Sequence, residues 1–489
     1  MSLISVSNLT FAYDGGDKIF ESVSFQIDTD WKLGFIGRNG RGKTTFLNLL
    51  LGKFEYGGNI SAGAEFEYFP YEVPETADTL DALRDVNPHV EQWELLRELS
   101  LLDVREDVLY RPFEILSRGE RTKALLAALF CKDDCFLLLD EPTNHLDNHA
   151  RKILGRYLRS KKGFILVSHD RELLDTCVDH VLSINKTNIE VQRGNFSSWR
   201  ENKRRQDEME LAENERLKKD IKRLDEAARR TSSWSDKVEK TKGSRNSGVK
   251  VDKGYVGHKA AKMMKRSKNI EARLEAQIEK KSGLLRNVES VDDLKIVPLR
   301  YHAKTLVKVE NLSLFYGEKQ VCENVTFTIE QGDRIALRGK NGSGKSSILE
   351  RILGQDISYL GDFRAGSNLV ISYVPQDASF LRGELVDFVK NHGLDESLFK
   401  AILRKLDFSR GQFEKDMSDF SAGQKKKTLI AKSLCEKAHL YIWDEPLNFI
   451  DVFSRMQIEE LLLRFAPTIL FVEHDGAFCE RVSTKKILL

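Results

Sequence analysis

The sequence contains the same set of motifs twice, 302 residues apart, and this duplication limits the folds open to the chain. A glycine-rich segment runs from Gly37 to Thr44 (GRNGRGKT) and again from Gly339 to Ser346 (GKNGSGKS). Each copy is followed by an apolar run that ends in two acids, at Asp140-Glu141 and at Asp444-Glu445. Because 489 residues are too many for one hydrophobic core, we expect two α/β domains built alike.

The first glycine-rich segment lies between a predicted strand and a predicted helix. Apolar residues 33–36 precede it, and the mostly apolar residues 45–50 follow it. In a strand–loop–helix unit of this kind, backbone N–H groups and the helix N-terminus hold phosphate oxygens. Lys43 would then reach the outer phosphates, and the Thr44 hydroxyl would hold Mg²⁺. The sequence therefore predicts ATP and Mg²⁺ as ligands.

The acids at the end of the apolar run 136–139 fit the chemistry of ATP hydrolysis. Asp140 fits a carboxylate on the magnesium side, and Glu141 fits the carboxylate that polarises the attacking water. Another apolar run ends at His169, which could contact the transferred phosphate. Taken singly, the two acids could cap a loop and the histidine could be structural. The second copy repeats the same order of residues with Asp444, Glu445 and His474.

Two further features occupy matching positions in both copies. Ser117 and Gly119 precede a helical pattern, so they are expected at a helix N-terminus suited to a γ-phosphate. Tyr13 and Tyr316 each end an opening strand and could stack on adenine, although ordinary strand packing explains them equally well.

The segment between the two copies is the only large insertion, and its charge is unevenly spread. Residues 200–228 hold nine basic and nine acidic residues, whereas residues 229–268 hold thirteen basic and three acidic residues. Apolar residues recur at helical spacing within 217–228 and within 263–285, with glycine-containing residues 242–257 between them. We predict an antiparallel helical hairpin with arms of roughly 35–40 residues, each on the order of 50–60 Å long.

The basic tip of this hairpin predicts a polyanionic partner, and a solvated coiled-coil linker remains the alternative. Solubility gives no reason to concentrate charge at one end, whereas contacts with phosphates do. The ring of Tyr255 could stack on a base. The residues predicted to contact RNA are Lys240, Lys242, Arg245, Lys250, Lys253, Tyr255 and Lys259.

Composition argues against several other classes of protein. The chain has no run of 18 apolar residues that could span a bilayer, and its first residues lack a hydrophobic signal core. Its six cysteines are scattered without a CxxC pair, which argues against a disulfide framework or a metal cluster. We therefore expect a cytoplasmic protein with no membrane segment and no metal cluster.

Taken together, the motifs resemble the Walker A, signature, Walker B, D-loop (Asp147) and switch-histidine motifs of ABC-type ATPases over nearly the whole chain. The resemblance implies two domains that pair head to tail in a monomer, with each ATP between the Walker A motif of one domain and the signature of the other. It also implies a Q-loop glutamine, which is Gln376 in the second copy. The first copy departs from the pattern, because Tyr71 stands at the matching position.

These observations give a complete set of predicted site residues. The predicted catalytic residues are Glu141, Glu445, His169 and His474. The ATP-binding residues of the first copy are Tyr13, Gly37, Asn39, Gly40, Gly42, Lys43, Thr44, Thr45, Asp140, Ser117, Gly119 and Glu120. Those of the second copy are Tyr316, Gly339, Asn341, Gly342, Gly344, Lys345, Ser346, Ser347, Gln376, Asp444, Ser421, Gly423 and Gln424. The predicted Mg²⁺ ligands are Thr44, Asp140, Ser346, Gln376 and Asp444.

Two such domains, predicted at 1–198 and 305–489, and a charged helical linker at 199–304 resemble the ABC-F class of translation factors. The likeness is greatest to the antibiotic-resistance branch of Lsa and Vga type, including the variant loop Leu447–Asp451. It implies a factor that enters the E site of the 70S ribosome, where its linker contacts 23S rRNA and the P-site tRNA. Lincosamides, streptogramins A and pleuromutilins would be displaced there.

Three other functions remain open at this point. The first is a housekeeping ABC-F factor that relieves stalled ribosomes. The second is the ATPase subunit of a membrane transporter, which would leave the basic hairpin unexplained. The third is a DNA-maintenance ATPase, in which the coiled coil is usually far longer or carries zinc-binding cysteines.

Overall fold

The computed structural model describes residues 2–13, 15, 18–71, 73, 78–144, 146–184, 189–241, 295–340 and 342–489. The chain separates into two units, of which the first comprises Met1–Trp199 and Asp292–Leu489 and the second comprises Arg200–Val291. Seven of the predicted site residues lie outside the described residues, and these are Lys242, Arg245, Lys250, Lys253, Tyr255, Lys259 and Asn341. The predicted second arm of the hairpin lies outside them as well. Lys240 belongs to a described helix, but its side chain is not described.

The first half of the first unit is built on a largely parallel sheet. Among the described residues its strand order is β5-β6-β7-β3-β8-β9, and only β9 runs antiparallel to its neighbour. The central strands β3, β6 and β7 are mostly apolar and buried, as strands covered on both faces are expected to be. The strands are β3 (Lys32–Gly37), β5 (Glu65–Phe69), β6 (Cys135–Asp140), β7 (Phe164–Val167), β8 (His180–Ile184) and β9 (Ile189–Arg193).

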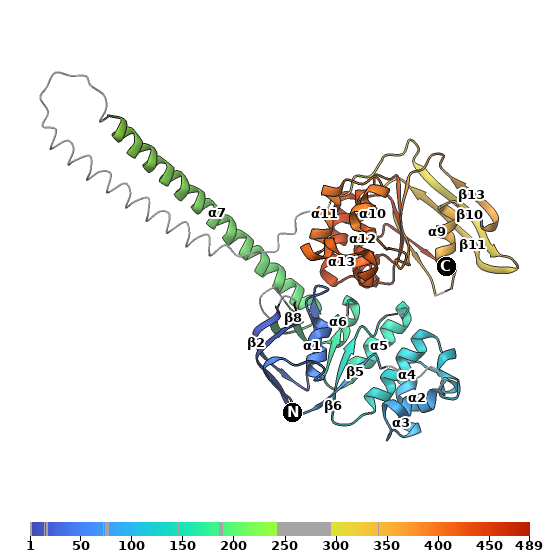
Figure 1. The fold of residues 1–489 in the computed structure, drawn as a ribbon. Helices are drawn as coiled ribbons and strands as arrows, with labels where there is room; N and C mark the ends of the chain where they lie inside the picture. Colours follow the sequence, from blue (N-terminus) through green and yellow to red (C-terminus); the bar gives the residue numbers. More distant parts are fainter. Residues whose placement is uncertain are drawn as a thin grey trace, which may run out of the picture. The chain divides into compact units, whose positions relative to one another are not determined.

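A three-stranded antiparallel sheet and a group of helices complete this half. The sheet has the order β2-β1-β4, with β1 at Leu3–Ala12, β2 at Lys18–Asp28 and β4 at Gly57–Ser61. Helices α2, α3 and α4 gather at the end of this half that lies away from β2 (Figure 1). The helices are α1 (Lys43–Leu50), α2 (Thr79–Val86), α3 (Gln92–Leu101), α4 (Arg118–Phe130), α5 (Asn148–Ser160) and α6 (Arg171–Cys177), with short 3₁₀ helices at Glu106–Tyr110 and Phe113–Ile115.

The second half repeats this plan. Its parallel sheet has the order β14-β15-β16-β12-β17, and an antiparallel sheet has the order β11-β10-β13. The strands are β10 (Thr305–Tyr316), β11 (Lys319–Glu330), β12 (Arg334–Arg338), β13 (Ser358–Ala365), β14 (Ile371–Val374), β15 (Leu440–Asp444), β16 (Ile469–Val472) and β17 (Lys485–Leu488). The duplicated α/β fold predicted from the sequence is confirmed.

The helices of the second half also follow the first. Helices α10 to α13 lie together, and β10, β11 and β13 lie on the opposite side of this half (Figure 1). The helices are α9 (Lys345–Ile352), α10 (Leu385–Asn391), α11 (Glu396–Lys405), α12 (Ala422–Cys435), α13 (Val452–Phe465) and α14 (Gly476–Val482), with 3₁₀ helices at Arg410–Glu414 and Met417–Asp419.

Helix α7 (Phe196–Thr241) starts in the first unit and continues into the second. Its first turn is anchored by Phe196 and Trp199, which are buried in the core of the first half. Beyond that turn its surface carries charged pairs one turn apart, such as Lys203–Asp207 at 3.1 Å, which support a solvated helix. With 46 residues, α7 is longer than the predicted arm, and its first turn lies inside the first half. Among the described residues, no helix is both long and apolar enough to cross a membrane.

Candidate functional site

The first phosphate loop joins β3 to α1, and its glycines are required by the backbone. Gly40 and Gly42 have φ angles of 79° and 91°, in the left-handed region that favours glycine. A Cβ atom at Gly42 would also lie 2.5 Å from a methyl carbon of Ile19. The Lys43 ammonium donates to the carbonyl oxygens of Gly37, at 2.8 Å, and Arg38, at 3.2 Å. The loop therefore wraps around a buried cation, and burial lowers the pKa of Lys43.

At the ends of β6 and β15, a hydroxyl group meets a carboxylate in each half. The Thr44 hydroxyl donates to Oδ2 of Asp140 at 2.9 Å, and the Ser346 hydroxyl donates to Oδ2 of Asp444 at 2.9 Å. Oδ1 of Asp444 is buried and has no hydrogen-bond partner in the described part of the chain. A buried carboxylate oxygen beside a hydroxyl suits Mg²⁺, which prefers oxygen ligands. Burial raises the pKa of Asp444 to about 6.

The two glutamates that follow these aspartates each lie beside a histidine. Oε1 of Glu141 is 3.1 Å from Nε2 of His169, and Oε1 of Glu445 is 3.3 Å from Nε2 of His474. Both glutamates have positive φ angles, 51° and 47°, which cost backbone energy in a residue other than glycine. The same backbone strain thus recurs at the matching position of both copies.

The surroundings move the acidities of the two glutamates in opposite directions. Burial, followed by the charge of Asp140, raises the pKa of Glu141 above its ordinary value. Burial would also raise the pKa of Glu445, but hydrogen bonds from His474, Gln376 and Asn448 outweigh it and lower the pKa to about 2. Glu445 is therefore ionised at any physiological pH, whereas Glu141 holds its proton more firmly.

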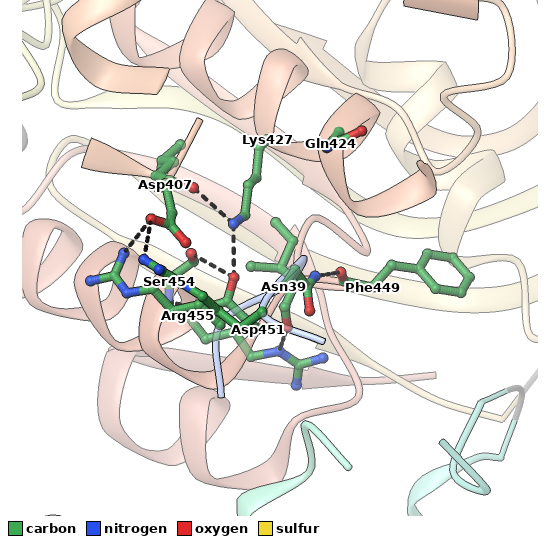
Figure 2. A network of polar contacts seen from close by, with 12 residues as sticks. Asn39, Asp407, Gln424, Lys427, Phe449, Asp451, Ser454 and Arg455 are labelled. Carbon is green, nitrogen blue, oxygen red and sulfur yellow. Dashed lines mark hydrogen bonds and ion pairs between the residues drawn. The ribbon is translucent and has the colours of Figure 1, made fainter. Parts of the chain in front are cut away.

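A cavity of about 490 Å³ brings the predicted residues of the first copy together with the second signature. From the first half it is lined by the phosphate loop, Asp140, Glu141 and His169, and from the second half by Ser421 and Gly423. The Asn39 side-chain amide donates to the carbonyl oxygen of Phe449 at 2.8 Å, which joins the two halves beside this cavity (Figure 2). Phosphate loop and signature of opposite copies thus face one cavity.

Glu120 and Gln424 lie at the signatures and fix the starts of the helices. Oε2 of Glu120 accepts from the backbone N–H of Ser117 at 2.9 Å, and the Ser117 hydroxyl oxygen accepts from the N–H of Glu120. Gln424 and Ser421 form the same reciprocal pair at the start of α12. These capping boxes orient both helix N-termini.

Other predicted residues lie around the two loops. Tyr13 lines the cavity, and its hydroxyl lies 3.1 Å from that of Thr45. Tyr316, about half exposed like Tyr13, donates to Glu350 at 3.0 Å. Burial lowers the pKa of Lys345, and the charge of Asp147 from the first half is among those that oppose this shift. The ligand-binding and catalytic roles of all these residues stay predictions.

Sequence reasoning missed three polar residues at the first site. Tyr68 donates to Oδ2 of Asp140 at 3.1 Å, whereas Tyr71, at the Q-loop position, packs against the core of the first half. Arg151 and Arg455 line the cavity. Each arginine follows the aspartate that caps its helix by four residues, and this repeat was the available signal.

The fold and the site define an ATPase with two phosphate loops, and comparisons with known proteins agree. The profile of the family described as "ABC transporter" matches residues 20–144 and 322–448. The chain belongs to this family and contains two copies of its ATPase domain. Within the family it is an ABC-F ATPase, as its relatives indicate.

Two curated relatives match nearly the whole chain. Ribosome protection protein VmlR of Bacillus subtilis (strain 168) is 28% identical, and the match covers 100% of this chain and 86% of VmlR. The energy-dependent translational throttle protein EttA of Haemophilus influenzae is 26% identical, with coverage of 95% and 88%. Among solved structures, archaeal ribosome recycling factor aABCE1, in complex with stalk protein aP1, has a TM-score of 0.63 at 19% identity, with coverage of 98% and 87%. That likeness supports the fold.

Proposed function

We propose that the chain is an ATP-dependent ribosome protection factor that binds the E site of the 70S ribosome and displaces antibiotics from the large subunit. The observation that carries this proposal is the similarity to a ribosome protection protein over all of the chain, connector included. The shared cavity supports its ATP dependence, because phosphate loop and signature from opposite halves line it. A bound ATP would touch both halves at once.

The residues divide the chemical work in each site. Lys43 and Lys345 bring positive charge to the phosphates, and the N-termini of α12 and α4 add N–H donors and a favourable dipole. Thr44 with Asp140, and Ser346 with Asp444, would hold Mg²⁺, which when bound neutralises phosphate charge. Glu141 and Glu445 orient the attacking water, while His169 and His474 hold the glutamates and face the transferred phosphate.

The connector then provides the output. The connector is the linker at 199–304, and its root is the first turn of α7, residues 196–199. ATP held between the halves favours one arrangement of the first unit, and the root of α7 is packed into that unit. The residues predicted at the tip, among them the basic Lys253 and the aromatic Tyr255, would contact 23S rRNA and the P-site tRNA. Drug is displaced through the shifted RNA, and hydrolysis releases the factor.

Trapping the ATP-bound state tests the proposal. The double variant Glu141→Gln/Glu445→Gln should co-sediment with 70S ribosomes when ATP is present and lose this association without ATP. The matched control Lys43→Ala/Lys345→Ala keeps the glutamates but removes the phosphate-binding lysines, so it should not respond to ATP. Co-sedimentation of the glutamine variant that is the same with and without ATP would contradict the proposal.

The similarity to EttA favours a second candidate, a housekeeping factor that acts on translation without protecting it from drugs. Minimum inhibitory concentrations of lincosamides, streptogramins A and pleuromutilins separate the two functions. Expression of the wild type should raise at least one of them under the protection proposal, and Tyr255→Ala should reduce that gain. Unchanged values for every drug together with intact ribosome binding would favour the housekeeping role.

A further inference from the structure

One aromatic side chain of the second half touches both the first phosphate loop and the root of the connector. Phe453 lies in the first turn of α13 and packs against the core of the first half, in which the neighbouring Val452 is buried. The guanidinium carbon of Arg38 lies 5.8 Å from the centre of the Phe453 ring. The ring of Trp199 meets Phe453 edge-on, with centroids 5.8 Å apart. Both separations are within the range of attractive ring contacts.

The two residues that Phe453 contacts, Arg38 and Trp199, lie in the two segments that act in the proposed function. These segments are the first phosphate loop and the connector. Arg38 is the second residue of the phosphate loop, next to the carbonyl oxygens that hold Lys43. Trp199 is the last residue of the first of the two segments that make up the first unit, on the first turn of α7, and only 4% of its surface is exposed. The ring of Phe453 therefore lies between the first phosphate loop and the root of the connector, and it contacts both.

Charged and polar contacts fix the position of Arg38 relative to the start of α13. Asp407 of the second half lies 3.9 Å from the guanidinium of Arg38 and 3.4 Å from that of Arg41. Inside the second half, the buried Lys427 ammonium donates to the carbonyl oxygen of Leu406 at 2.8 Å and to Oδ2 of Asp451 at 2.7 Å. Figure 2 shows Lys427 reaching from α12 toward Asp451, and Asn39 reaching Phe449. Lys427 thus binds both loops of the second half that touch the first phosphate loop, the one with Asp407 and the one with Phe449.

The first half carries a histidine, His149, at the position that matches Phe453. His149 follows the capping Asp147 by two residues, as Phe453 follows Asp451. In the described part of the chain His149 is largely exposed and lies 3.6 Å from Asp103 of its own half. The second phosphate loop carries Lys340 where the first carries Arg38. Contact with the root of α7 is therefore a property of the first ATP site.

We propose that Phe453 is a positioning residue that transmits the state of the first ATP site to the connector, through Arg38 on one side and Trp199 on the other. ATP at the first phosphate loop draws Arg38 and α13 together, and the Phe453 ring then holds the first turn of α7. The second ATP site contributes to hydrolysis but makes no direct contact of this kind among the residues that the structure describes. The inference rests on the proposed ATP-dependent action, which it assigns to one of the two sites.

Hydrogen exchange of full-length protein tests the inference without ribosomes. In the Glu141→Gln/Glu445→Gln background, added ATP should slow exchange of the amides of residues 196–206 by about two- to fivefold, since ring contacts of this kind contribute about 0.5–1 kcal/mol. Phe453→Leu, which keeps an apolar side chain, should abolish that slowing, and Phe453→Tyr should retain it. Amides 43–50, next to the phosphate loop, should still respond to ATP in Phe453→Leu, because nucleotide binding itself is intact.

The matched control is His149→Leu at the equivalent position of the first half, which should leave the response at 196–206 unchanged. An ATP response at 196–206 that survives in Phe453→Leu, or that is lost equally in His149→Leu, would overturn the inference. Failure of the proposed function looks different, since ribosome co-sedimentation would then be independent of ATP even with the response at 196–206 intact. Phe453→Leu should in turn weaken ATP-dependent co-sedimentation while the maximal ATPase rate stays within about twofold of wild type.

Discussion

The two candidate ATP sites share most of their residue types and differ in how their glutamates are held. Asn448 follows Glu445 by three residues and donates to its carboxylate at 2.6 Å. Asn144 stands at the same distance from Glu141, but among the described residues its only hydrogen bond to Glu141 is between backbone groups. Gln376 adds a further donor to Glu445, whereas the first copy has Tyr71 at that position.

A second difference lies in the lysines that follow the signatures. Lys427 has two buried hydrogen bonds, whereas Lys123, six residues after Ser117 as Lys427 is after Ser421, has none in the described part of the chain. The duplicated motifs thus set the chemistry that both sites can perform. The contacts around these motifs determine in which site the catalytic glutamate is held more firmly. They also determine which site is joined more tightly to the other half. We expect the two sites to behave unequally.

Removing the buried lysine should give the largest effect. Lys427→Met leaves the fully buried Asp451 without its ionic partner, and breaking a buried pair of this kind costs about 3–5 kcal/mol. Lys123→Met should cost only about 1 kcal/mol, because no hydrogen bond is lost among the described residues. Thermal unfolding of both variants measures the difference. Equal losses would show that the contrast between the halves has no energetic weight.

The pH dependence of hydrolysis should separate the two glutamates. Glu445→Gln leaves only the first site active, and Glu141→Gln leaves only the second. A base acts only when deprotonated, and the pKa of Glu141 is raised. The ATPase rate of the first site should therefore fall as the pH drops below that pKa, by up to about tenfold per pH unit. The second site, with the pKa of Glu445 at about 2, should change only near pH 6, where Asp444 loses its proton.

Steady-state ATPase rates of the two single variants between pH 5.5 and 8.5 measure both profiles. Binding of Mg²⁺ requires ionised Asp444, so second-site activity should fall as the pH drops through about 6. Superimposable profiles for the two variants would contradict the assigned difference between the glutamates.

The smallest expected effect concerns the charged contact at the first phosphate loop. In the Glu445→Gln background, Asp407→Asn should raise the half-saturating ATP concentration about two- to fivefold without changing the maximal rate, because partly exposed ion pairs contribute up to about 1 kcal/mol. The difference should shrink at high salt. Asp103→Asn, at the matching position of the first half, serves as the control and should have no such effect. A shift in the maximal rate instead would refute a role in holding the phosphate loop.

The sequence by itself determined the fold class and the duplication, and it predicted the residues of both candidate sites. Glycine-rich loops, apolar strands ending in acids, and serines before helices are local patterns with strong backbone preferences, so their positions could be read directly. The linker was predicted from residue 199, and helix α7 begins at Phe196. Phe196 and Trp199 are buried in the core of the first half, and periodicity alone does not reveal such packing.

Only the tertiary structure decided which residues meet. Tyr68 rather than Tyr71 approaches Asp140, because Tyr68 lies in β5 beside β6, whereas Tyr71 follows the end of that strand and packs against the core. Arg455 lines the first cavity from the second half, and Phe453 bridges Arg38 and Trp199, which are far apart in the chain. The sequence supplies two similar sets of groups that differ at a few positions, such as Tyr71 and Gln376. Packing between the halves depends on pairs of surfaces, and it makes the two sites more unequal.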